Sequence, residues 1–135
     1  MSDYSIRPIG WVRSPLKERQ QAPHQGRPAG VEAELVIEKT ALQGLDGIQA
    51  GDKLFVLCWL HMADRKILRV HPRGNPAVPK RGVFATRSPD RPNPLGLCLV
   101  DVLDVDGPVL KVRGLDAVDG TPVVDLKPYI ISLDT

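Results

Sequence analysis

The stretch LGLCLVDVLDV (residues 95–105), DG (106–107) and PVLKVRGLDAV (108–118) decides the fold class of this chain. Apolar residues alternate with others in both long runs, which is the pattern of a half-buried β-strand. The dipeptide Asp106-Gly107 between them is a strong signal for a tight hairpin turn, because glycine readily adopts the positive φ that such turns need. The stretch therefore predicts two neighbouring antiparallel strands and a mainly β fold.

Further strands are predicted on both sides of this hairpin. Alternation predicts strands over residues 4–13 and 31–37, the apolar run within 53–61 indicates a central strand, and a short strand is expected within 122–132. Helical spacing of apolar residues occurs only over 39–48. These elements predict a single-sheet antiparallel β-barrel with one or two short helices and long Pro/Gly-rich loops, because closure removes the unpaired edges of a sheet.

Length and composition limit the classes of protein. The 135 residues predict a single domain over 1–135, and the formal charge of +2 argues against indiscriminate nucleic-acid binding while allowing a local basic patch. No apolar run approaches the roughly 20 residues of a membrane helix, and no signal peptide is recognisable, so a cytoplasmic protein without membrane contact is expected. Cys58 and Cys98 lie in apolar runs and are expected to be buried free thiols.

Several common sites are not predicted. The chain contains no glycine-rich nucleotide-binding motif and no serine-hydrolase elbow, which argues against a Rossmann-type methyltransferase or dehydrogenase. His24, His61 and His71 are scattered, and the two cysteines are not spaced as metal ligands, so no metal site is expected.

A proline-rich segment, TRSPDRPNPLG (residues 86–96), stands out before the hairpin. Its three prolines fix φ and hold the preceding residues extended, which excludes a helix. A stiff loop loses little entropy when a ligand binds, which favours a binding site, although a proline-rich hairpin with solvated arginines fits the same residues. Arg87 and Arg91 offer planar forks that match carboxylate or phosphate oxygens.

Cations gather in the same part of the chain. Eight of the 18 Lys and Arg residues lie between positions 65 and 91, and the segment 65–80 is expected to be a mobile connection.

Three further candidate sites lie elsewhere in the chain. The clusters APHQG (22–26) and GLDAVDGTP (114–122) are predicted to be polar loops, and His61 follows the predicted central strand. Each has a structural alternative, namely a solvated turn or a histidine that only completes a strand end.

Four segments in order resemble a known family. They are PIGWVRSPLKERQQAPHQG (8–26), LFVLCWLH (54–61), GVFATRSPDRPNPLGLCLV (82–100) and GLDAVDGTPVVDLKPYI (114–130). Together they resemble the TsaA-like family of small β-barrel methyltransferases that use S-adenosyl-L-methionine, whose best-known branch is the bacterial TrmO enzymes. The resemblance implies N6-methylation of threonylcarbamoyladenosine next to the anticodon of tRNA. It also implies a homodimer with the cofactor near the subunit interface.

The resemblance also implies where the site residues lie. The expected cofactor contacts are Pro23, His24, Gln25, His61, Met62, Arg87, Leu97, Asp116, Ala117, Val118, Asp119, Gly120 and Thr121. The acceptor nitrogen must lose a proton, and the candidate bases are His61, Asp116 and Asp119. Phosphate contacts are expected from Arg65, Lys66, Arg69, Arg73, Lys80, Arg81 and Arg91.

The methyl acceptor stays open at this stage. The sequence stops at Thr135, whereas longer bacterial members of the family continue into a second small domain. Three functions therefore fit: a tRNA methyltransferase, a small-molecule methyltransferase of the same fold, and a non-catalytic module that binds S-adenosyl-L-methionine. Salt-dependent RNA binding separates the first from the second, and methyl turnover separates both from the third.

Overall fold

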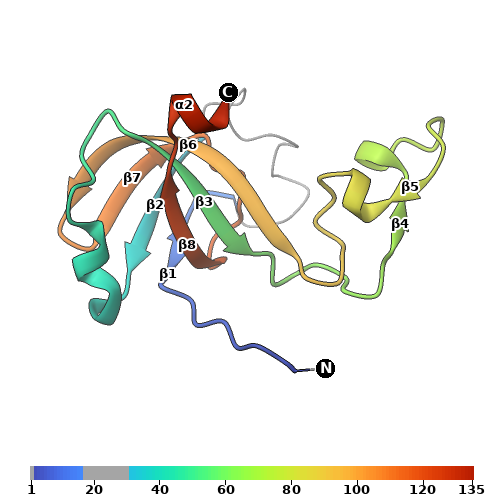
Figure 1. Cartoon of the computed structure of the whole chain (residues 1–135), viewed down its shortest axis with the longest axis horizontal. Coiled ribbons are helices and arrows are strands. Elements are labelled where there is room, and N and C mark those ends of the chain that lie inside the picture. Colours follow the sequence, from blue (N-terminus) through green and yellow to red (C-terminus); the bar gives the residue numbers. More distant parts are fainter. Residues whose placement is uncertain (1, 17–30) are drawn as a thin grey trace.

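A closed antiparallel β-barrel forms the centre of the molecule in a computed structural model that describes residues 2–16 and 31–135 (Figure 1). Around the barrel the strands follow the order β1-β2-β7-β6-β3-β8. This confirms the predicted fold class. The strand bounds are β1 Gly10–Arg13, β2 Glu32–Ile37, β3 Lys53–Trp59, β6 Leu95–Asp106, β7 Val109–Arg113 and β8 Pro122–Pro128.

The predicted hairpin is the β6–β7 pair. Asp106 pairs with Val109, so the connection is a two-residue turn, and Gly107 takes the positive φ of 56° that this position requires. The same β6 strand pairs along its first half with β3, which makes it the longest strand of the barrel at 12 residues. The hairpin signal in the sequence was therefore correct.

Every second side chain along the strands points inward and fills the barrel interior. Leu35, Val56, Val100, Leu110 and Val112 come from four strands, β2, β3, β6 and β7, and are fully buried inside it. One position has no room for any side chain, because a Cβ on Gly10 would lie 2.2 Å from the carbonyl oxygen of Val36. Close contact between β1 and β2 therefore requires glycine there.

Two predicted elements differ in extent from those observed. The strand expected over residues 4–13 is limited to Gly10–Arg13, because Gly10 already pairs with Ile37, the last residue of β2. Apolar and polar residues also alternate before Gly10, but β2 has no further residue with which they could pair. The expected helix over 39–48 is the 3₁₀ helix η2 (Lys39–Leu45), and the chain closes with the short helix α2 (Ile131–Asp134).

A small lobe, residues 60–94, stands beside the barrel between β3 and β6 (Figure 1). It contains the two-stranded sheet of β4 (Arg69–Val70) and β5 (Arg81–Gly82), with the 3₁₀ helices η3 (Pro72–Gly74) and η4 (Val83–Ala85). The sequence predicted a mobile connection over 65–80 and did not predict these elements; its mobility stays a prediction. Pairing between β4 and β5 supplies the backbone hydrogen bonds that the sequence pattern did not reveal.

Candidate functional site

The antiparallel order gathers the predicted site segments at one rim of the barrel. Strands β1, β3 and β7 end at this rim, and β2, β6 and β8 begin there. The lobe connects β3 to β6, and residues 114–121 connect β7 to β8, so both leave from the rim. Pro23, His24 and Gln25 belong to the connection between β1 and β2 and lie outside the described residues. We refer to this end as the site rim.

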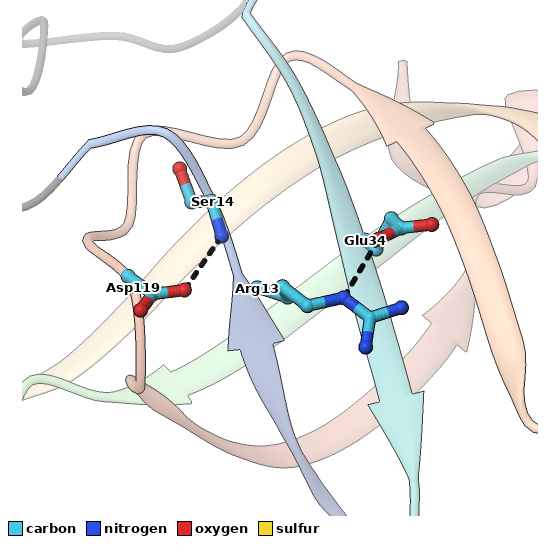
Figure 2. Close-up of polar contacts among 4 residues, drawn as sticks. All are labelled: Arg13, Ser14, Glu34 and Asp119. Carbon is cyan, nitrogen blue, oxygen red and sulfur yellow. Dashed lines mark hydrogen bonds and ion pairs between the residues drawn. The ribbon is translucent and has the colours of Figure 1, made fainter.

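Hydrogen bonds attach the 114–121 loop to the end of β1. The Ser14 N–H donates to Oδ1 of Asp119 at 2.9 Å (Figure 2). In return, the Asp119 N–H donates to the carbonyl of Leu16 at 2.7 Å, and the Gly120 N–H donates to Val12. One carboxylate oxygen of Asp119 therefore holds the rim together, which is a structural role that the sequence did not separate from a catalytic one.

Three predicted cofactor contacts in this loop have buried side chains. Ala117, Val118 and Thr121 are buried, and the Thr121 hydroxyl donates to the Val118 carbonyl at 2.7 Å. Because these side chains are buried, the backbone groups are what this part of the loop offers to a ligand. Gly120, in contrast, is exposed, and its φ of 84° is one that glycine adopts readily in a turn.

Asp116 forms the most unusual polar contact of the rim. It is half-buried, and the Cys98 thiol on β6 donates to its Oδ1 at 2.9 Å. Burial raises the pKa of Asp116, and the hydrogen bond from Cys98 lowers it in part. A carboxylate with restricted access to water and one fixed partner is typical of binding and catalytic sites.

The two cysteines are free, as expected from the sequence, with Cys58 buried and Cys98 half-buried. Burial raises the pKa of the Cys58 thiol to about 12, and the charge of Asp116 adds to this increase. Burial also raises the pKa of Cys98, with Asp116 again contributing. Both groups stay protonated at neutral pH, so they act as hydrogen-bond donors or packing groups and not as nucleophiles.

The other predicted contacts lie where the lobe joins the barrel. His61 and Met62 follow β3 and are exposed, and Leu97 is exposed on the outer face of β6. A hydrogen bond of 2.8 Å from the Leu60 N–H to the Pro94 carbonyl holds the two ends of the lobe together. The rim thus brings the end of β3 next to the start of β6, as the paired strands require.

Arg87 and Arg91 have different surroundings although they lie in the same loop. Arg87 is exposed and forms no hydrogen bond or ion pair within residues 2–16 and 31–135. Arg91 instead donates from Nε to the Ser88 carbonyl at 2.9 Å, and its terminal nitrogen donates to the carbonyls of Val83 and Thr86. Arg87 is therefore available for an anionic ligand, and Arg91 holds the loop in shape.

Arg65 also contacts other residues of the protein. Its Nε donates to the Pro92 carbonyl at 2.7 Å, and its guanidinium carbon lies 5.1 Å from the centre of the Trp59 ring. Near it, the Asp64 N–H donates to Oδ1 of Asp90 at 2.8 Å. Two of the seven predicted phosphate contacts, Arg65 and Arg91, thus donate hydrogen bonds of 2.9 Å or shorter to backbone carbonyls, which their spacing in the sequence could not have revealed.

The remaining predicted phosphate contacts are exposed. Arg69 reaches the Lys80 carbonyl at 3.4 Å, and no ion pair to these side chains occurs in the part of the chain that the structure describes. They present uncompensated positive charge on the lobe, and they are Lys66, Arg69, Arg73, Lys80 and Arg81. Sequence reasoning missed Phe84, which is 78% exposed among these cations.

A shallow groove of about 240 Å³ lies at the site rim between β1, β2 and β7. It is lined in part by Arg13 and Glu34, which form an ion pair of 2.7 Å (Figure 2). Pockets that enclose drug-sized ligands are usually about 300–1,000 Å³, so this groove is smaller than such a pocket.

Two further features are not found within residues 2–16 and 31–135. No cluster of three His, Cys, Asp or Glu residues there suits a metal ion, and none of the helices has the length and apolar character of a membrane span.

Comparison with known proteins identifies related chains. The family model described as the tRNA-methyltransferase O N-terminal domain matches residues 11–135. A probable S-adenosyl-L-methionine-binding protein of Methanothermobacter thermautotrophicus is 53% identical over 100% of this chain and 98% of that protein. The tRNA (adenine(37)-N6)-methyltransferase of Escherichia coli is 38% identical over 96% of this chain and 59% of that enzyme.

A solved structure agrees with the barrel. The crystal structure of TrmO from Pseudomonas aeruginosa matches with a TM-score of 0.82 and 30% sequence identity, over 99% of this chain and 59% of that chain. The present chain therefore spans about three fifths of the length of that TrmO chain and of the E. coli enzyme, but nearly all of the M. thermautotrophicus protein.

Proposed function

Because the chain belongs to the family of tRNA-methyltransferase O N-terminal domains, we propose that it binds S-adenosyl-L-methionine at the site rim and transfers the methyl group to tRNA. Two observations carry this proposal: Asp116 at the rim is a half-buried carboxylate, and Arg87 in the lobe that leaves the rim is exposed and has no partner among the described residues. The names of the M. thermautotrophicus and E. coli relatives support the cofactor and the reaction respectively.

The charges of the rim suit the cofactor. S-adenosyl-L-methionine carries a carboxylate and an amine at one end, and Arg87 and Asp116 offer the opposite charges to these groups. The proposed contacts then continue along the apolar Met62 and Leu97 and the backbone of residues 117–121. The loop residues Pro23, His24 and Gln25 complete the set. When bound, the cofactor supplies an electrophilic methyl group, and the chain's task is to align the acceptor nitrogen with it.

A base must also remove a proton from the acceptor. His61 is exposed and near the rim, where an incoming substrate can reach it. Asp116 and Asp119 remain candidates, but each has one carboxylate oxygen already accepting a hydrogen bond, from Cys98 and from Ser14. We therefore place His61 first in this role.

The proposed acceptor is the N6 atom of threonylcarbamoyladenosine next to the anticodon. Support comes from the E. coli relative, whose name specifies the adenine at position 37 of tRNA. The lobe connects to the barrel at the site rim, and its exposed cations supply the positive charge that tRNA phosphates require. A tRNA substrate also agrees with the reduced cysteines and with a cytoplasmic location.

A methylation assay tests the proposal directly. The full chain is incubated with methyl-labelled S-adenosyl-L-methionine and tRNA, with or without the threonylcarbamoyl modification. We expect label only in modified tRNA, and His61→Ala is expected to lower the rate by about 10²-fold or more, a larger loss than that of cofactor affinity. Cofactor binding without label in any tRNA would support the small-molecule enzyme or the non-catalytic module instead.

We further propose that the chain forms a homodimer through the outer face of β3 and β6. Outward-facing residues of the two strands lie directly opposite one another, as in the pairs Leu57–Leu97 and Trp59–Leu95. Leu95 is 40% and Leu97 45% exposed, so this face presents contiguous apolar side chains to solvent. Such a patch is typical of a protein interface. A partner there would also close the open site rim beside Leu97.

The substitution Leu95→Glu is expected to separate the dimer into monomers. A charge at the centre of an apolar interface loses its hydration on association, which disfavours burial by several kcal/mol. Sedimentation velocity measures the change, and Leu42→Glu, an exposed leucine on η2 away from this face, is the matched control. A wild-type chain that sediments as a monomer at all concentrations would contradict this proposal.

A further inference from the structure

Phe84 is an exposed aromatic side chain on a rigid backbone. The neighbouring Val83 is 1% exposed and anchors η4 in the lobe, whereas Phe84 is 78% exposed. The Val83 carbonyl accepts hydrogen bonds from the Thr86 N–H, the Thr86 hydroxyl and the Arg91 guanidinium. The Val83 N–H donates to the Leu68 carbonyl at 2.9 Å. The backbone that carries Phe84 is therefore held in place before any ligand arrives.

The charge around Phe84 is strongly positive. Residues 60–94 contain eight Lys and Arg and only two acids, a formal charge of +6, and the other 100 residues carry −4. One of the two acids, Asp90, accepts a hydrogen bond from the Asp64 N–H. The nearest cations along the chain are Lys80, Arg81 and Arg87, all exposed. The lobe thus combines an aromatic face with charges suited to an anionic polymer.

We propose that the lobe binds unpaired RNA nucleotides, with one base stacked on Phe84 and the flanking phosphates on Arg81, Lys80 and neighbouring cations. A base exposes its flat face only where the strand is unpaired, as in a loop, and stacking on aromatic side chains is the usual way in which proteins bind such bases. This inference rests on the proposed function, because it assigns the same RNA a contact outside the methyl-transfer site.

A second copy of the chain fits this surface less well. The apolar face proposed for the dimer lies on β3 and β6 of the barrel and carries leucines opposite one another. Phe84 instead lies in the lobe, where two copies brought together face to face place like charges near each other. RNA has the opposite charge, so its phosphates can neutralise the positive charge of the lobe without any contact to the barrel.

Fluorescence anisotropy with a labelled single-stranded RNA of about 10 nucleotides tests the inference without cofactor or turnover. We expect Phe84→Ala to weaken binding by about 5- to 100-fold, and Phe84→Trp to keep wild-type affinity. Tyr4→Ala is the matched control, because Tyr4 is 91% exposed outside the lobe. A duplex of the same length is expected to bind equally to wild type and Phe84→Ala.

The salt dependence separates stacking from charge. Phe84→Ala is expected to leave the slope of log affinity against log salt unchanged, whereas Arg81→Ala lowers it by about one. Lys39→Ala, which removes an exposed cation on η2, serves as its control. Equal affinity of wild type and Phe84→Ala for the single strand overturns the inference, and so does absence of RNA binding by wild type.

Two other results have distinct meanings. If Phe84→Ala changes the sedimentation coefficient from dimer to monomer, Phe84 belongs to a subunit interface and the inference is overturned. If the single strand binds through Phe84 but no tRNA is methylated, the inference stands and the proposed methyl transfer fails. Binding and methylation therefore report on the two proposals separately.

Discussion

Arg91→Ala is expected to lower the free energy of unfolding by about 2–4 kcal/mol and the rate of methyl transfer by about 10²-fold. The guanidinium of Arg91 holds the carbonyls of Ser88, Val83 and Thr86 at once, and alanine leaves these acceptors without that donor. The loop that carries Arg87 then loses its fixed shape. Small displacements of a positioning group are enough to reduce transfer strongly, because the reaction requires alignment of acceptor, methyl and sulfur.

Thermal unfolding followed by the methylation assay measures both effects. Arg91→Lys is expected to rescue neither, since one ammonium cannot reproduce a planar fork that reaches three carbonyls. Arg81→Ala removes the same charge from the lobe without breaking such contacts, and it is expected to leave the melting temperature close to that of wild type. Equal melting temperatures for Arg91→Ala and Arg81→Ala would show that the three hydrogen bonds contribute little.

Asp116→Asn is expected to weaken S-adenosyl-L-methionine binding by about 10- to 100-fold without destabilising the fold. Burial raises the pKa of Asp116 above its usual value, so the folded chain holds this proton more tightly than the unfolded chain does. Stability is therefore fully present below the unfolded pKa and declines as pH rises through the raised pKa of the folded state. Asparagine removes that decline and still accepts the hydrogen bond from Cys98.

The pH dependence of cofactor affinity gives the second signature. The cofactor amine is bound by the ionised carboxylate, so wild-type affinity is expected to fall as pH drops through the pKa of Asp116. The thiol of Cys98 lowers this pKa in part, hence Cys98→Ala is expected to move the fall to higher pH. Cys98→Ser keeps a donor and is expected to restore the wild-type profile. Isothermal titration between pH 4 and 8 distinguishes these cases.

The opposite changes in stability and binding decide the role of Asp116. If Asp116 only accepts the hydrogen bond from Cys98, Asp116→Asn keeps that contact and cofactor affinity is expected to stay at the wild-type level. A binding carboxylate loses affinity while the fold becomes equally or more stable at neutral pH. An Asp116→Asn variant that binds the cofactor as well as wild type would remove Asp116 from the proposed site.

Local pattern was sufficient to predict the architecture. Alternation with a period of two depends only on neighbouring residues, and a glycine at the turn needs no distant partner, so the β6–β7 hairpin and the barrel class followed from the chain itself. The same logic failed at residues 4–9, where the alternation continues but β2 has already ended. Strand length depends on a partner that local pattern does not contain.

The order of motifs in the sequence also determined the family, since four segments in order resembled it and the family match covers residues 11–135. Only the tertiary structure decided what each side chain in those motifs does. Arg87 and Arg91 look alike in the sequence, yet Arg87 has no partner among residues 2–16 and 31–135, whereas Arg91 donates hydrogen bonds to three carbonyls. The thiol of Cys98 meets Asp116 across 18 positions, and Phe84 is exposed beside a buried valine. Hydrogen-bond partners and exposure are set by long-range packing, which closure of the barrel determines and residue spacing does not.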